Sequence, residues 1–238
     1  MTSGPTAARR DSALRSAKLS QAPMAIRRPA LLLLLLAVLC AVPAMASTYR
    51  TLEAEATLAA DGEVQLEIPV AELTVEGTDG DRVELELEID CRSDACRRKA
   101  ERIRIDQRGD GDRAHFEIDG YPSNMGSKPD LTLRVRMPRD RHLSLELGVG
   151  EVEISGIDGN LEIEVGVGDV DLDLDESAVR SVDLAVGVGD AELDLPSRYS
   201  SNESGFLFLG QERSWDDGPG RANVDLEVGV GDATVTVR

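Results

Sequence analysis

Three aspartates stand in the same sequence context, each directly after the second glycine of a GVGD motif. They are Asp169, Asp190 and Asp232, and a fourth copy carries Glu151 instead. If the copies are stacked, their carboxylates lie ~5 Å apart and repel each other unless they are solvated or bridged by a cation such as calcium. The motif therefore predicts either weak calcium binding at Asp169, Asp190 and Asp232 or a column of solvated acidic side chains.

The surroundings of these aspartates differ from known glycine-rich binding loops. The calcium roll has a period of nine residues and an aspartate two residues after a glycine. Here Asp169 follows Gly168 directly, and the motif returns after 18 and 21 residues. A phosphate loop needs a lysine and a helix on its far side, whereas a strand-like run follows GVGD. Beyond weak calcium binding, no cofactor is expected.

The motif coincides with a slip in the hydrophobic pattern. Apolar residues occupy odd positions from Leu161 to Val167 and even positions from Val170 to Leu174. Such a slip would turn the core face outward unless the backbone bends between the two runs, and glycine and aspartate tolerate a sharp bend. We therefore predict a corner between two strands at each copy. The corner residues of the three full copies are Gly166, Gly168, Asp169, Gly187, Gly189, Asp190, Gly229, Gly231 and Asp232.

The spacing of the copies indicates a repeat architecture. Their first glycines lie at positions 148, 166, 187 and 229, in steps of 18, 21 and 42. Short alternating runs flank each copy, which is typical of half-buried strands, and a period of ~20 residues is the size of one solenoid coil. We predict one all-β domain over residues 47–238, a parallel β-helix or β-roll-like solenoid. An antiparallel β-sandwich of repeated hairpins is the alternative, because alternation fixes the buried face and not the strand direction.

The longest step contains a segment unlike the repeats, residues 197–222. It holds four of the seven aromatic residues in the chain, Tyr199, Phe206, Phe208 and Trp215. The segment is either an inserted hairpin that covers one flank of the repeats or a loop that binds a protein or a carbohydrate.

The CRSDAC sequence contains two cysteines, Cys91 and Cys96. In an oxidising compartment a short-loop disulfide between them is expected. A metal site is the alternative, although no histidine or third cysteine lies nearby and the spacing is not CxxC.

Residues 1–46 predict export. Arg27 and Arg28 precede an apolar run that ends in Ala-Met-Ala, which is the pattern of a signal peptide cleaved after Ala46, and Met24 is an alternative start. Of the 26 basic and 45 acidic residues in the chain, six and one lie in this leader, so the remainder holds 20 and 44 and has a net charge of −24. Such a surface excludes nucleic acid as a partner. The processed protein is expected in the periplasm or at the cell surface and not as an integral membrane protein.

Catalytic patterns are missing from the sequence. Two histidines, His115 and His142, stand in or beside strand-like runs, and neither GxSxG nor HExxH occurs. We therefore expect no enzymatic activity. The alternative is a carbohydrate-active enzyme or a calcium-assisted polysaccharide-binding protein that uses the acidic face and the aromatic segment.

The run LRVRMPRDRHLSLELGVGEVEISGIDGNLEIEVGVGDVDL, which ends at Leu172, resembles families of bacterial envelope proteins named putative adhesins, including the head GIN domain. The shared pattern is a strand that ends in Met137-Pro138, a strand–GxG–strand unit, and a turn at Gly156 to Gly159. The resemblance implies an exported, repetitive β-solenoid that acts in the envelope as an adhesin or scaffold, without catalytic residues. Its partner would be a protein or a carbohydrate.

Overall fold

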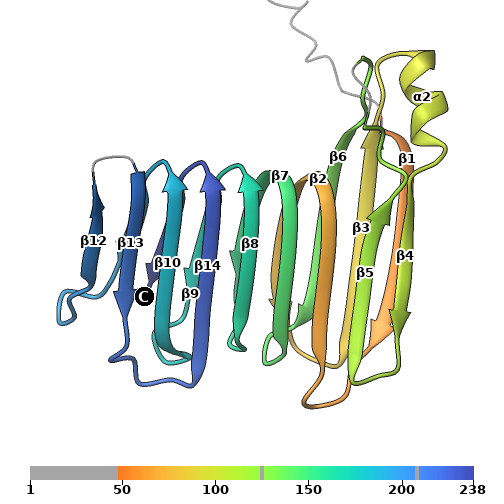
Figure 1. Cartoon of the computed structure of the whole chain (residues 1–238). Coiled ribbons are helices and arrows are strands. Elements are labelled where there is room, and N and C mark those ends of the chain that lie inside the picture. Colours follow the sequence, from red (N-terminus) through yellow and green to blue (C-terminus); the bar gives the residue numbers. More distant parts are fainter. Residues whose placement is uncertain (1–47, 124–125, 207–208) are drawn as a thin grey trace, which may run out of the picture. The chain divides into compact units, whose positions relative to one another are not determined.

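The computed structural model describes residues 48–123, 126–206 and 209–238 (Figure 1). The export signal predicted over 1–46 and the aromatic residue Phe208 lie outside these residues. Within them, the strands belong to a single 15-stranded mixed sheet. The predicted all-β class is therefore confirmed.

The strands before the repeats are β1 (Thr48–Thr57), β2 (Glu63–Thr78), β3 (Arg82–Asp90), β4 (Arg104–Gly109), β5 (Arg113–Asp119) and β6 (Asp130–Pro138). The strands of the repeats are β7 (His142–Ser155), β8 (Leu161–Val167), β9 (Val170–Leu174), β10 (Val179–Val188), β11 (Ala191–Asp194), β14 (Ala222–Val230) and β15 (Ala233–Val237). Between β11 and β14 lie β12 (Asn202–Phe206) and β13 (Leu209–Trp215).

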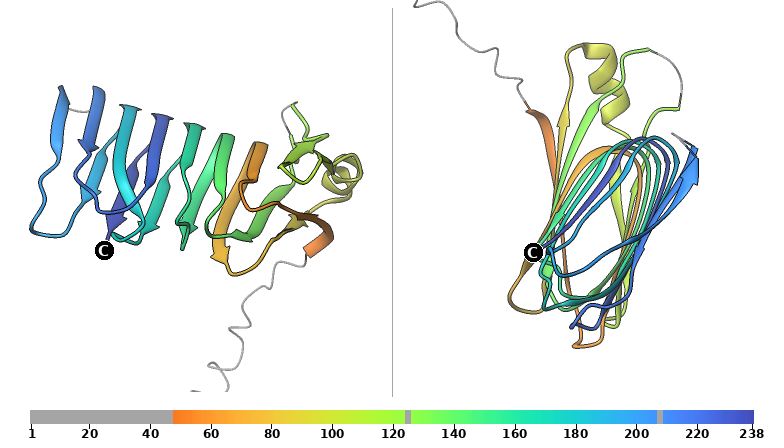
Figure 2. Two further views of the ribbon diagram at one scale, coloured as in Figure 1. Left: turned by 90° about the horizontal axis from the view of Figure 1, so that it is seen from below. Right: turned by 90° about the vertical axis from the view of Figure 1, so that its left-hand side faces the viewer.

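The sheet bends so that it forms two walls, which enclose a common interior in the end-on view (Figure 2). The long strands β2 and β7 pass from one wall to the other. Over Glu63–Glu67, β2 pairs with β5, and over Glu72–Thr78 it pairs with β6. The first wall also contains β4, β8, β14, β10, β13 and β12, and the second contains β1, β3, β9, β15 and β11. Alternate side chains from both walls form one aliphatic core.

Strand direction differs between the middle and the two ends of the sheet. The repeat strands pair in parallel, from β2 and β7 through β8 and β14 to β10. Antiparallel pairs occur where β1, β3 and β6 end one wall, where β4 meets β5, and where β13 and β12 extend from β10. The prediction of parallel coils throughout is therefore wrong at the ends, because antiparallel strands can be joined by short turns where no further coil follows.

The repeats do not stack in the order of the sequence. Strand β14 lies between β8 and β10 in the first wall, and β15 lies between β9 and β11 in the second. The last repeat of the chain is therefore inserted between two earlier ones. The sequence suggested simple succession with one coil lost to the insertion; that interpretation is wrong, because equal registers allow any order of stacking.

The corner prediction can be followed in the burial of the valines around Gly168. Val165 and Val170 are both buried, with 3% and 1% of their surface exposed, although they lie on opposite sides of the phase slip. Val167, expected to face inward with Val165, is 46% exposed. The backbone turns already at Gly166, so this valine projects from the outside of the corner.

The predicted helix and disulfide are both present. Helix α2 (Asp94–Ala100) begins after Ser93, whose hydroxyl oxygen accepts the backbone N–H of Cys96 at 3.2 Å. Cys91 and Cys96 form a disulfide with their Cα atoms 5.5 Å apart. The bond ties the start of the helix to the end of β3.

Candidate functional site

The second glycine of each motif brings the backbones of stacked repeats together at the corner. Gly168 has φ +148°, and a Cβ on it would lie 1.6 Å from the carbonyl oxygen of Gly150. A Cβ on Gly231 would lie 1.9 Å from the oxygen of Gly168, and one on Gly189 would lie 1.8 Å from that of Gly231. A side chain at these positions would be strained by the backbone angle and would also clash. The glycines are therefore required by the architecture.

The aspartates of the motif hydrogen-bond along the stack. Asp169 Oδ1 accepts the backbone N–H of Asp232 at 3.0 Å, and Asp232 Oδ1 accepts that of Asp190 at 2.9 Å. Gln211 ends the series, since its Nε2 donates to Asp190 Oδ1 at 3.0 Å and its Oε1 accepts the backbone N–H of Ala191 at 3.1 Å. Each aspartate thus helps to fix the corner of the next repeat. Calcium binding by these aspartates stays a prediction.

The middle valines of the motifs form an exposed apolar row along the corner, which we call the valine ridge. Its members pair in register from strand to strand: Val70, Val149, Val167, Val230 and Val188. The last four are each 44–46% exposed. Covering these four side chains would contribute about 3 to 5 kcal/mol, since full burial of an aliphatic side chain is worth roughly 1.5–3 kcal/mol. A continuous exposed row of this kind is typical of a contact surface.

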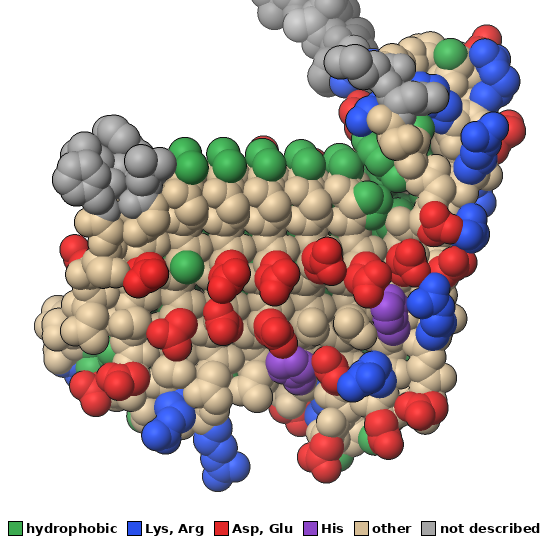
Figure 3. Space-filling view, in the orientation of Figure 1, with side chains coloured by type: hydrophobic (Ala, Val, Ile, Leu, Met, Phe, Trp, Pro, Cys, Tyr) green, Lys and Arg blue, Asp and Glu red, His purple; other side chains and the backbone are tan. Residues whose placement is uncertain are grey.

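Beside the ridge, the first wall carries a hollow and then a row of carboxylates (Figure 3). The hollow has a volume of about 590 Å³ and lies over Gly148, Gly166, Gly187 and Gly229. The glutamate row consists of residues paired across adjacent strands: Glu117, Glu67, Glu146, Glu164 and Glu227. Glycines leave the hollow without side chains, so valine and glutamate side chains stand on either side of it.

A second acidic row runs on the other side of the valine ridge, which we call the corner acid row. Its members follow the ridge residues by two positions and are all exposed: Glu72, Glu151, Asp169, Asp232 and Asp190. The ridge is therefore an apolar strip between two rows of negative charge.

The middle of the glutamate row has no cationic partner among the residues that the structure describes. Glu146, Glu164 and Glu227 make no ion pair or side-chain hydrogen bond with described residues. Neighbouring carboxylates ~5 Å apart repel each other by on the order of 1 kcal/mol even at the dielectric constant of water. The row therefore concentrates negative potential beside the hollow.

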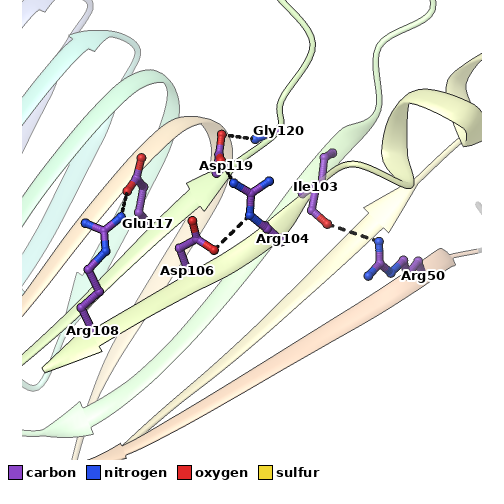
Figure 4. A network of polar contacts seen from close by, with 8 residues as sticks. All are labelled: Arg50, Ile103, Arg104, Asp106, Arg108, Glu117, Asp119 and Gly120. Carbon is purple, nitrogen blue, oxygen red and sulfur yellow. Dashed lines mark hydrogen bonds and ion pairs between the residues drawn. The ribbon is translucent and has the colours of Figure 1, made fainter.

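At the edge of the first wall, by contrast, the carboxylates are paired with arginines (Figure 4). Arg108 Nη2 donates to Glu117 Oε2 at 2.7 Å, and Arg104 Nε donates to Asp106 Oδ1 at 3.0 Å. Arg104 also contacts Asp119. Hydrogen bonding to Asp106 and the charges of both aspartates raise the pKa of Arg104 above its usual value. This part of the sheet is neutralised internally.

One group of side chains at the end of the glutamate row has the composition of a metal site. Ligand atoms of Glu67, His115 and Glu117 all lie within 4.8 Å of one another. His115 Nε2 lies 3.5 Å from Glu67 Oε1 and has no hydrogen-bond partner among the described residues. An imidazole with two carboxylates suits zinc or another transition metal better than calcium. The pairing of Glu117 with Arg108 competes with such an ion.

The aromatic residues of the segment 197–222 are placed in two ways. Trp215 is buried with 2% of its surface exposed, and its ring centroid lies 4.9 Å from that of Tyr199. The hydroxyl of Tyr199 donates to Glu176 Oε1 at 2.9 Å. Phe206 ends β12, and its side chain is not among those described. Tyr199 and Trp215 therefore pack against the core, and β13 covers the edge of β10 as a flanking hairpin would; ligand binding by the segment stays a prediction.

Sequence reasoning identified the glycines and aspartates of the corner but missed the valine ridge and the glutamate row. The signal for the ridge was the glycine on each side of every middle valine, which places the bend around that residue. The row could not be found in this way, because it depends on the register between strands. Within the described ranges, no helix has the length and apolar character to cross a membrane.

Comparison with known proteins supports the fold. A putative cell adhesion protein from Clostridium sporogenes is 14% identical, with a TM-score of 0.51 over 79% of this chain and 100% of that chain. A putative adhesin from Parabacteroides merdae is 11% identical over 79% and 81% of the two chains, with a TM-score of 0.27. A putative lipid-binding protein from Parabacteroides distasonis is 9% identical over 80% and 97%, with a TM-score of 0.25. No curated protein matches the chain significantly.

A family model gives the assignment. Residues 45–206 match the N-terminal domain of toast_rack, DUF2154. The match covers β1 to β12 and ends before the inserted repeat of β14 and β15. The finer head GIN label is not among these matches, although the adhesin-like class of the structural neighbours agrees with the expected one. The chain belongs to the family of the toast_rack N-terminal domain, DUF2154.

Proposed function

We propose that this chain is an exported, non-catalytic binding protein of the cell envelope, an adhesin or scaffold that holds a partner along its corner. The observation that carries the proposal is the valine ridge, a row of side chains each 44–46% exposed at Val149, Val167, Val188 and Val230. The motif that builds the fold also places this apolar strip at one level in every repeat. The predicted leader and the Cys91–Cys96 disulfide support an oxidising location.

We further infer that the repeats act as coils of a rigid β-solenoid. The parallel registers of β7, β8, β14 and β10 support this inference, as do the corner hydrogen bonds between Asp169, Asp232 and Asp190. A rigid stack keeps the valines aligned at the strand spacing of ~4.8 Å. The proposed partner therefore meets a preformed surface, which lowers the entropic cost of binding.

Fractionation of cells that produce the full chain tests the location. We expect the protein in the periplasmic or outer surface fraction with its N-terminus at Ser47, as measured by mass spectrometry. An unprocessed chain in the cytoplasm would contradict the proposal. Whether it resides in the periplasm or on the surface is decided by digestion of intact cells with a protease.

Cation-assisted carbohydrate binding is a second candidate function, favoured by the group of Glu67, His115 and Glu117 within 4.8 Å. Calorimetric titration with zinc and calcium, followed by a glycan array with and without the ion, tests it. Saturable binding of a glycan that depends on the ion and is lost in His115→Ala would favour this candidate. Turnover of the glycan would contradict the non-catalytic proposal.

A further inference from the structure

The valine ridge and its two acidic rows together define the chemistry of a partner. The ridge is apolar, and exposed carboxylates flank it on both sides, with Glu146 and Glu164 on the first wall and Glu151 and Asp169 at the corner. A partner that covers the ridge must bring apolar groups to the valines. It must also bring positive charge to both sides, because it desolvates the carboxylates that it approaches.

Charge excludes two other occupants of the ridge. The chain has a net charge of −19, so a second copy would place acidic rows against acidic rows. An anionic membrane surface would be repelled for the same reason. The partner is therefore a cationic amphipathic molecule.

The spacing of the ridge favours a helical partner over an extended one. Successive valines are one strand apart, ~4.8 Å, so the four steps of the ridge cover ~19 Å. Side chains on one face of a helix recur each turn at ~5.4 Å, whereas those on one face of an extended chain recur at ~6.7 Å. Over four steps the helix departs from the ridge by ~2 Å and the extended chain by ~8 Å. Only the helix keeps its apolar face over every valine.

The width of the surface agrees with this choice. Three residues separate Glu146 from Val149 along β7, which corresponds to ~10 Å of strand. A helix with its side chains is ~10–12 Å across. The hollow of about 590 Å³ over the glycines lies between the two rows and leaves room for its side chains.

We propose that the valine ridge, the hollow beside it and the two acidic rows dock a cationic amphipathic helix of ~13 residues from a partner polypeptide. Apolar residues of this helix cover Val149, Val167 and Val230. Its lysine or arginine side chains reach the glutamate row on one side and the corner acid row on the other. This inference rests on the proposed function and names the class of its partner.

Titration with synthetic peptides tests the proposal. The probe is a fluorescent peptide of ~14 residues, made of leucine and lysine with the leucines on one helical face. Two comparison peptides carry the same composition with leucine and lysine alternating, or glutamate in place of lysine. We expect saturable binding of the helical probe with a gain of helical circular dichroism. The alternating peptide should bind at least about tenfold more weakly, which corresponds to ~1.4 kcal/mol, and the acidic peptide should not bind. Equal binding of the alternating peptide would overturn the helical assignment.

Three sets of variants locate the binding surface. Val149→Thr with Val167→Thr and Val230→Thr keeps the side-chain shape and should weaken binding by about tenfold or more. Glu146→Gln with Glu164→Gln and Glu227→Gln should weaken it similarly and reduce its dependence on salt.

The matched control is Glu84→Gln with Glu86→Gln and Glu88→Gln, which removes the same charge from the other wall and should change the affinity less than about twofold. An equal loss in this control, or no loss in the valine variant, would overturn the proposal. Circular dichroism confirms that each variant is folded. A processed envelope protein that does not bind the probe would contradict this inference alone, whereas a cytoplasmic, unprocessed protein would contradict the proposed function.

Discussion

The antiparallel end of the second wall and the repeats of the first wall treat the same kind of side chain in opposite ways. On β3 and β6, Arg134 Nη1 lies 2.9 Å from Glu88 Oε1, and hydrogen bonding to that carboxylate raises the pKa of Arg134. On the repeats, Glu146, Glu164 and Glu227 face no cation among the described residues. Unpaired acid is therefore a local property of the surface beside the valine ridge and not a general consequence of the acidic composition. The comparison indicates that a partner supplies the missing charge.

The two regions also differ in how they are assembled. The antiparallel end consists of consecutive strands joined by short turns, whereas the repeats depend on a C-terminal segment inserted between two earlier coils. The ridge passes through this inserted segment at Val230, which lies between Val167 and Val188. The binding surface is therefore complete only when the chain has folded to its last strands.

Removal of residues 222–238 should separate the two regions most strongly. Coils β8–β9 and β10–β11 lose their shared neighbour, and we expect a loss of about 5 kcal/mol or more, comparable to the whole stability of a domain. Hydrogen exchange should show lost protection over 161–195 with residual protection in β3 and β6. Unchanged protection over 161–195 would show that the inserted coil is not essential.

A glycine substitution tests the close approach at the corner. Gly168→Ala should cost about 3 kcal/mol or more, because its Cβ would lie 1.6 Å from a carbonyl oxygen in addition to the strain of φ +148°. Gly80→Ala is the matched control, with φ +120° and nothing within 4 Å, and should cost only about 1 kcal/mol. Urea unfolding measures both. Equal costs would mean that backbone strain alone accounts for the glycine at the corner.

Charge removal should have opposite effects in the two regions. Glu146→Gln with Glu164→Gln and Glu227→Gln should stabilise the protein by about 1 kcal/mol at low salt, since it relieves repulsion. Glu88→Gln removes the partner of Arg134 and should cost between zero and about 1 kcal/mol. Thermal unfolding at low and high salt measures the two effects, and the gain should shrink as salt screens the row. A loss of stability in the triple variant would mean that the row is already neutralised.

The smallest effect is expected from the tether of the inserted segment. Arg198 and Tyr199 hydrogen-bond to Glu176 and lower the pKa of that carboxyl below its ordinary value of 4.5. A lowered pKa in the folded state gives stability that is present above about pH 4.5 and is lost as the pH falls through the lowered value. Fluorescence of Trp215, which contacts Tyr199, should report a local change in that acidic range. The change should be absent in Glu176→Gln, and its persistence there would assign it to another group.

Much of the architecture could be predicted because the motif combines a phase slip with glycine. Val165 and Val170 required a bend between them if both were to be buried, and Gly168 could supply it. Two features could not be derived in the same way. Period-two alternation places Val167 inside until the start of the bend is known, and only the structure shows that the backbone turns at Gly166.

The order of the repeats and the glutamate row depend on pairing between strands. Each coil has the same pattern of apolar positions, so the sequence does not distinguish a last coil at the end of the stack from one inserted within it. Likewise, Glu146, Glu164 and Glu227 occupy ordinary outward positions in their own strands. They become a row only because β7, β8 and β14 are neighbours in register.

The labelling rate of a cysteine introduced at Val167 tests most directly whether the repeats present valines outward for a partner. A maleimide should modify Val167→Cys in the folded protein about as fast as an exposed thiol, and Val165→Cys only after unfolding, relative to the unsubstituted chain. The helical leucine–lysine peptide should slow the reaction at Val167→Cys. Slow labelling at position 167 without peptide, or fast labelling at 165, would contradict the account of the corner; labelling that the peptide leaves unchanged would contradict the ridge as its docking surface.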